Sequence, residues 1–182
     1  MARINPLSIE TAPPASAEIL SQVKAKIGMV PNLFGTIAHS PAALGAYLAF
    51  SEAIGESSIS PALREQIALT TAGSNSCDYC ASAHTLMGKG AGVDSDELTR
   101  NLSGDSSDPK TQAALTFAAA IVNKQGWADD TDLAAVRSAG FTQEEIVEII
   151  AVVSINIFTN YFNHIAEVDI DFPVVRSPAN AS

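Results

Sequence analysis

Residues 61–93 of this 182-residue chain, PALREQIALTTAGSNSCDYCASAHTLMGKGAGV, carry its clearest structural signals. Ser60 followed by a proline is typical of a helix N-terminus, because serine caps free amides and proline fits the first turn. This helix is predicted to run to about residue 72, where Gly73-Ser74-Asn75-Ser76 interrupts the pattern. Ser76 is expected to cap a second helix that begins at Cys77 and ends at 88–92. So short a turn lets the two helices fold back antiparallel to each other.

The apolar residues keep a helical spacing on both sides of this pair. Before it, the spacing predicts helices over 17–27, 32–38 and 42–54. After it, helices are predicted at 94–101, 109–125 and 131–138, followed by a long helix that Thr142 and Glu145 open as a capping box. Asp94 and Glu97 resemble a second capping pair, and residues 102–108 are the best linker candidate. Only residues 168–172 resemble a strand, so the sequence predicts an all-α fold.

The length of the chain fits a single domain. We expect one helical domain over residues 1–182, with a cysteine-containing core at about 40–102. C-terminal helices are expected at about 108–166 and an extended tail at 169–182. The long helix is apolar around most of its circumference over residues 146–158. Such a helix is typical of the centre of a bundle or of a surface shared with a neighbouring subunit.

The composition excludes several classes of protein. Apolar residues make up 47% of the chain and charged residues 16%, which excludes disorder for most of its length. A net charge of −10 repels phosphate backbones and anionic lipids, so we expect neither nucleic-acid nor membrane binding. Residues 1–16 lack the pattern of a signal peptide, and the apolar stretch 146–158 is too short to span a bilayer. We therefore expect a soluble, cytoplasmic protein.

The two cysteines of the chain, Cys77 and Cys80, are separated by two residues. In a reducing compartment this spacing indicates redox chemistry or metal binding more often than a structural disulfide. Cys77, Cys80 and His84 lie at positions i, i+3 and i+7, so they share one helix face. From the preceding helix, Glu65 can approach His84, hold its tautomer and make it a better base. This predicts a relay in which His84 takes a thiol proton and a thiolate attacks a peroxide. The resulting sulfenic acid then condenses with the second thiol.

Two arguments assign the attacking thiolate differently. The helix dipole favours Cys77, which is nearest the helix start, whereas the base favours Cys80, one turn from His84. We assign attack to Cys80. Cys77 is then expected to be an exposed first-turn thiol that resolves the sulfenic acid and meets an outside reductant.

The pattern Glu65-x11-Cys77-x2-Cys80-x3-His84 resembles the signature of the AhpD-like alkylhydroperoxidase family, within the carboxymuconolactone decarboxylase superfamily. The segment NIFTNYFNHIAEVDIDFP, residues 156–173, is similar to a branch of that family labelled peroxidase-related. The resemblance implies an all-helical bundle that assembles into homotrimers or hexamers through shared helices. It also implies thiol peroxidase activity, with Cys80 as the peroxidatic and Cys77 as the resolving residue. Glu65 and His84 would form the proton relay.

The chain departs from the family pattern at one position. The family prototype carries a histidine immediately before its second cysteine, as part of the same hydrogen-bond network, and this chain has Tyr79 there. A phenol can donate a hydrogen bond, but it cannot take a proton near pH 7. We count Tyr79 as an accessory candidate, together with Asn160 and His164, which lie four residues apart on the long helix. The expected substrate is a small hydroperoxide, no cofactor is expected to be bound, and the reductant is an external dithiol, either a small molecule or a protein.

Two other interpretations remain open. In a helical metal-binding protein, Cys77, Cys80 and His84 would hold zinc, with Glu65 or a solvent molecule as the fourth ligand. Structural zinc sites usually draw a second ligand pair from a separate knuckle, and the chain has no further cysteine, so no bound metal is expected. In a lyase or isomerase of the superfamily, Glu65 and His84 would carry out acid–base chemistry without the thiols.

Overall fold

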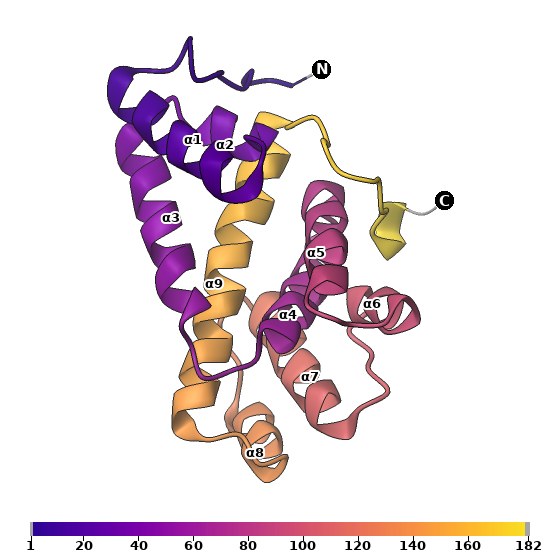
Figure 1. Cartoon of the computed structure of the whole chain (residues 1–182). Helices are drawn as coiled ribbons and strands as arrows, with labels where there is room; N and C mark the ends of the chain where they lie inside the picture. The colour runs from indigo at the N-terminus through magenta and orange to yellow at the C-terminus, as the bar shows by residue number, and fades with distance from the viewer. Residues whose placement is uncertain (1, 181–182) are drawn as a thin grey trace.

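The computed structural model describes residues 2–180, and nine α-helices account for most of them (Figure 1). In chain order the helices are α1 Pro14–Ile27, α2 Asn32–Ile37, α3 Pro41–Gly55, α4 Pro61–Ser74, α5 Asp78–Gly90, α6 Ser95–Leu102, α7 Pro109–Asn123, α8 Asp130–Ser138 and α9 Gln143–Ala166, followed by a 3-10 turn at Pro178–Asn180. No strand forms within residues 2–180, so the prediction of an all-α fold is confirmed. The strand suggested at 168–172 is wrong, because this extended segment has no second strand to pair with.

Capping side chains set most of the helix starts. Ser40, Ser60 and Asp108 each accept a hydrogen bond from the amide three residues further on. Thr142 forms the predicted capping box with Glu145 at the start of α9.

The capping pair predicted for α6 is wrong. Asp94 caps the helix alone, by accepting a hydrogen bond from the Asp96 amide. Glu97 instead accepts hydrogen bonds from the hydroxyl groups of Ser106 and Ser107. The carboxylate thereby ties the segment between α6 and α7, which the sequence suggests as a linker, to the body of the protein.

Helix α4 lies at the centre of the fold and packs against α5, α6, α7 and α9. It continues to Ser74, two residues beyond its predicted end, and only residues 75–77 separate it from α5. The close packing needs a glycine, because a Cβ atom on Gly73 would lie 1.8 Å from the carbonyl oxygen of Leu102. The α4–α5 hairpin is therefore a closely packed platform between the other helices.

Two clusters of buried side chains flank this platform. One brings together side chains from helices α1 through α6 and from residues 166–168, and it includes Cys77, Tyr79 and Cys80. The other joins α4, α7, α8 and α9. The cysteines thus belong to the first cluster and are held by packing from several helices.

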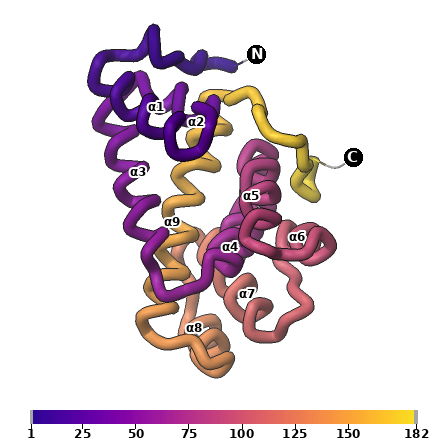
Figure 2. Tube along the Cα trace, in the orientation of Figure 1, coloured from indigo at the N-terminus to yellow at the C-terminus, as the bar shows by residue number. Residues whose placement is uncertain are grey.

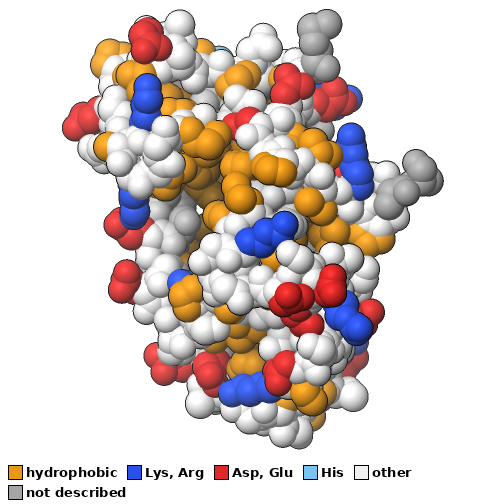
Figure 3. Space-filling view, turned by 45° about the vertical axis from the view of Figure 1, so that its right-hand side comes forward, with side chains coloured by type: hydrophobic (Ala, Val, Ile, Leu, Met, Phe, Trp, Pro, Cys, Tyr) orange, Lys and Arg blue, Asp and Glu red, His pale blue; other side chains and the backbone are white. Residues whose placement is uncertain are grey.

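Helix α9 is 24 residues long, and by length and composition alone it could cross a membrane. The core helices of soluble proteins pass the same test, and here α9 packs along α3, α4 and α7 (Figure 2). The helix extends beyond the apolar stretch 146–158, through buried asparagine and threonine residues to Ala166. The face in Figure 3 carries scattered acidic and basic side chains, with hydrophobic side chains gathered in its upper half.

Candidate active site

The α4–α5 hairpin brings Glu65 and His84 into contact. Nδ1 of His84 lies 2.8 Å from Oε2 of Glu65, and both side chains are about one fifth exposed, at 17% and 21%. Burial opposes protonation of the imidazole, but the charge of Glu65 outweighs it and raises the pKa of His84. Because Glu65 occupies Nδ1, the other ring nitrogen, Nε2, is left for proton exchange.

The two cysteines lie at the start of α5. Cys77 is the N-cap residue and Cys80 lies in the first turn, while Ser76 adopts a left-handed backbone with φ of 57°. The helix therefore begins one residue later than predicted, and Ser76 belongs to the turn and is not the cap. Both thiols are free and buried, with Cys77 1% and Cys80 2% exposed. The expectation of an exposed Cys77 is wrong.

Polar groups surround the Cys80 sulfur despite its burial. Asn163 on α9 donates a hydrogen bond from Nδ2 to Sγ, at 3.2 Å. Burial would raise the pKa of Cys80, but a hydrogen bond from the Cys77 thiol and the charge of His84 outweigh it and lower this pKa to about 7. The same hydrogen bond, together with burial, raises the pKa of Cys77. Near neutral pH a large fraction of Cys80 is therefore thiolate, whereas Cys77 keeps its proton.

The accessory candidates lie in different places. The Tyr79 hydroxyl accepts a hydrogen bond from the Leu33 amide, at 3.1 Å, so it contacts α2 and not the Glu65–His84 pair. Asn160 is fully buried, and its Oδ1 accepts a hydrogen bond from Asn75, at 2.9 Å. His164 is exposed on α9, at the edge of a cavity beside Cys77.

Sequence reasoning named Asn160 but missed the rest of the polar face that α9 turns toward the cysteines. Asn156, Thr159, Asn160 and Asn163 occupy positions i, i+3, i+4 and i+7, and all four are buried. Polar residues at this spacing in an otherwise apolar helix are a readable signal, because buried polar groups need partners. A second omission is Tyr47 on α3, which lines the same cavity as Glu65 and His84.

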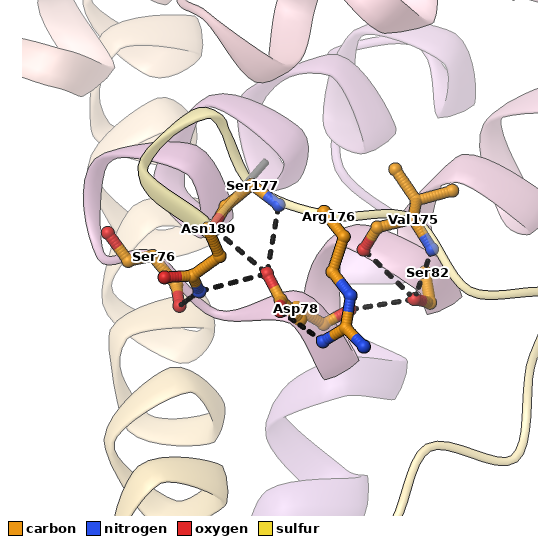
Figure 4. A network of polar contacts seen from close by, with 7 residues as sticks. All are labelled: Ser76, Asp78, Ser82, Val175, Arg176, Ser177 and Asn180. Atoms are coloured by element: carbon orange, nitrogen blue, oxygen red, sulfur yellow. Dashed lines mark hydrogen bonds and ion pairs between the residues drawn. The ribbon is translucent and has the colours of Figure 1, made fainter. Parts of the chain in front are cut away.

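A C-terminal strap, residues 175–180, covers the start of α5 (Figure 4). The Asp78 carboxylate accepts hydrogen bonds from the amide of Ser177, at 2.8 Å, and from its hydroxyl, at 2.9 Å. Arg176 forms an ion pair with the same carboxylate, at 2.7 Å. Burial opposes ionisation of Asp78, but these donors outweigh it and lower the pKa of the carboxyl. One turn further along α5, Ser82 accepts a hydrogen bond from the Val175 amide, at 2.9 Å.

Two separate cavities approach the site from different sides. One of about 220 Å³ is lined by residues that include Tyr47, Glu65 and His84, and it reaches α9 at residues 152–156. The other, of about 390 Å³, is lined by residues that include Cys77 and Asn180 of the strap, and it reaches residues 163–168 at and just beyond the end of α9. Asn156 and residue 163 are seven positions apart, which corresponds to about 10 Å along the helix, so the two cavities meet α9 at different places.

The residues proposed as zinc ligands do not surround one point. Within residues 2–180, no group of three or more histidine, cysteine, aspartate or glutamate side chains is arranged to hold a metal ion. His84 is paired with Glu65, and Cys77 is paired with Cys80. This arrangement lacks the four-ligand geometry that the metal-binding interpretation requires.

Comparison with known proteins identifies a family domain in the middle of the chain. Residues 41–104 match the carboxymuconolactone decarboxylase family. No curated protein matches the chain.

Solved structures share the fold over nearly the whole chain. An AhpD core protein, an uncharacterized peroxidase-related protein from Ralstonia eutropha JMP134, is 23% identical with a TM-score of 0.85, over 93% of this chain and 92% of that one. An uncharacterized peroxidase-related protein from Silicibacter sp. TM1040 is 25% identical with a TM-score of 0.78, over 86% and 85% of the two chains. The debrominase Bmp8 is 22% identical with a TM-score of 0.79, over 92% and 91%. The helices and their arrangement are thus those of AhpD-like proteins. The same fold also occurs in a debrominase.

Proposed function

The chain contains a carboxymuconolactone decarboxylase family domain in an AhpD-like fold, and on that basis we propose that it is a thiol peroxidase that reduces small hydroperoxides. The observation that carries this proposal is the environment of Cys80. Its pKa of about 7 provides a thiolate at neutral pH, and the neighbouring Cys77 keeps its proton. A thiolate beside a second thiol is the arrangement that a dithiol peroxidase needs.

The first half of the cycle oxidises the protein. The Cys80 thiolate attacks the distal oxygen of the hydroperoxide, the O–O bond breaks, and Cys80 becomes a sulfenic acid. The leaving alkoxide takes a proton from the His84 imidazolium, which Glu65 stabilises. The Cys77 sulfur then attacks the Cys80 sulfur, its proton leaves with the hydroxide as water, and a disulfide forms.

The second half returns both thiols. A dithiol reductant attacks the Cys77 sulfur, which is the cysteine that lines the cavity of about 390 Å³. Cys80 then leaves as the thiolate, and the thiol of lower pKa is the better leaving group. The second reductant thiol displaces Cys77, so the dithiol ends as a disulfide and the protein as two thiols. No bound cofactor takes part in this scheme.

The proposal is tested by the intact mass and thiol content of the protein after one equivalent of tert-butyl hydroperoxide. We expect the loss of two hydrogen atoms and of both free thiols together, and their recovery with dithiothreitol. Retention of both thiols would contradict a peroxidase. The same assay with 2,3,4-tribromopyrrole, which a variant of Bmp8 binds, tests a debrominase-type reaction. Turnover of an acid substrate that survives Cys80→Ser would instead support the lyase interpretation.

The strap is expected to limit access of the reductant to Cys77. In Asp78→Asn the carboxylate charge that holds Arg176 and Ser177 is lost, so the strap opens more often. We expect dithiothreitol to reduce the oxidised variant about fivefold faster than wild type. Asp130→Asn, a first-turn aspartate on α8, is the matched control and is expected to leave the rate unchanged. Equal rates for Asp78→Asn and wild type would show that the strap does not limit reduction.

We further propose that the protein is a cytoplasmic homo-oligomer. The support is a row of exposed apolar side chains along α9, at Val147, Ile150, Phe158, Tyr161 and Ile165. Removing such a row from water favours association of copies. A monomeric mass in light scattering at micromolar concentration would contradict this proposal.

A further inference from the structure

We propose that Tyr47 is a further catalytic residue, whose hydroxyl donates a hydrogen bond to the peroxide oxygen that leaves when Cys80 attacks. This inference rests on the proposed peroxidase function and adds a group that acts on the substrate. It places the hydroperoxide in the cavity of about 220 Å³, whose wall includes His84, one turn along α5 from Cys80.

The position of Tyr47 supports this role. It extends from α3 into the cavity that Glu65, His84 and Asn156 also line. Its ring packs against two phenylalanine rings, with centroid distances of 5.6 Å to Phe34 and 5.9 Å to Phe158. Packing against two rings restricts the direction of the hydroxyl.

The hydroxyl is available for a ligand. It forms no hydrogen bond with another group among residues 2–180, whereas the hydroxyl of Tyr79 is engaged with the Leu33 amide. The Tyr47 side chain is partly buried and lines the cavity, so a molecule bound there can reach it. A polar group that lines a cavity and has no protein partner can bond to a bound molecule without first breaking another bond.

Burial and the charges around Tyr47 favour its hydroxyl as a hydrogen-bond donor and not as a base. Burial, and then the charges of Cys80 and Glu65, raise the pKa of Tyr47. The phenol therefore keeps its proton throughout the pH range in which Cys80 becomes a thiolate. When the O–O bond breaks, negative charge develops on the leaving oxygen close to a carboxylate. A fixed donor at that point stabilises this charge in the transition state.

The test compares Tyr47→Phe with wild type in two reactions of Cys80, followed by stopped-flow and mass spectrometry. With tert-butyl hydroperoxide we expect the rate of Cys80 oxidation to fall about tenfold, because a single transition-state donor is lost. With iodoacetamide, which needs the thiolate but has no peroxide oxygen, we expect no loss of rate. The pKa of Cys80, measured from thiolate absorbance, is expected not to rise.

Ser138→Ala is the control, because it removes a hydroxyl from an exposed position on α8, outside both the cavity and the apolar row of α9. It is expected to match wild type in both reactions. Equal rates of oxidation for Tyr47→Phe and wild type would overturn the inference. A parallel loss of rate in both reactions would also overturn it, because Tyr47 would then act on the thiolate or on the fold. If wild type itself keeps both thiols with hydroperoxide, the peroxidase proposal fails and this inference falls with it.

Discussion

Cys80→Ser is expected to lower the rate of dithiol oxidation by hydroperoxide more than about 10³-fold, to the rate without protein. Serine has no ionised group at neutral pH and cannot take oxygen from a peroxide, so the first step of the cycle is lost. Helix α5 and the Glu65–His84 pair are expected to remain, because serine is close in size to cysteine at this buried position. The measurement is the rate of hydroperoxide consumption with dithiothreitol as reductant.

Cys77→Ser is the matched control for this prediction. It retains the Cys80 thiolate and loses only the resolving thiol, so we expect it to consume one equivalent of hydroperoxide. The product is a sulfenic acid at Cys80, which dimedone labels and peptide mapping locates. The opposite pattern, with Cys80→Ser still oxidised and Cys77→Ser inert, would assign attack to Cys77. That result would mean that the helix N-terminus outweighs the charge of His84 in ionising the thiol.

Glu65→Gln is expected to reduce the thiolate fraction of Cys80 at pH 7 about fivefold, and the rate of peroxide attack with it. Glu65 raises the pKa of His84, so a neutral glutamine leaves less imidazolium beside the thiols. The positive charge of His84 lowers the pKa of Cys80, and this pKa therefore rises in the variant from about 7. Since both proteins hold a thiolate at high pH, the difference in rate is expected to shrink above pH 9.

The measurement for Glu65→Gln is the thiolate absorbance and the oxidation rate of Cys80 as a function of pH. Glu52→Gln, an exposed glutamate on α3, controls for the loss of one negative charge from the protein. It is expected to titrate like wild type. A Glu65→Gln titration that coincides with wild type would mean that the carboxylate does not act through His84, and the proton relay would have to be abandoned.

The amino-acid sequence alone predicted the helices and the contact between Glu65 and His84. Helix starts such as Ser60, Asp108 and Thr142 depend on amides within the next three residues, so local chemistry decides them. Because the turn after Ser74 has only three residues, α4 and α5 pack against each other, and Glu65 then faces His84. The start of α5 was misplaced by one residue, because the left-handed backbone of Ser76 is a property of the turn that residue type does not reveal.

The all-α architecture, and the placing of Cys80 and His84 on one helix with Cys77 at its start, can be read from the sequence, because such features arise between neighbours in the chain. The surroundings of the thiols depend instead on tertiary contacts. Asn163, which bonds to Cys80, lies 83 residues from it in the sequence, and the strap that binds Asp78 comes from the C-terminal end of the chain. The burial of Cys77 and the position of Tyr47 likewise follow from how distant helices pack. Burial and charge from those distant parts determine which sulfur ionises, and no local pattern of residues records them.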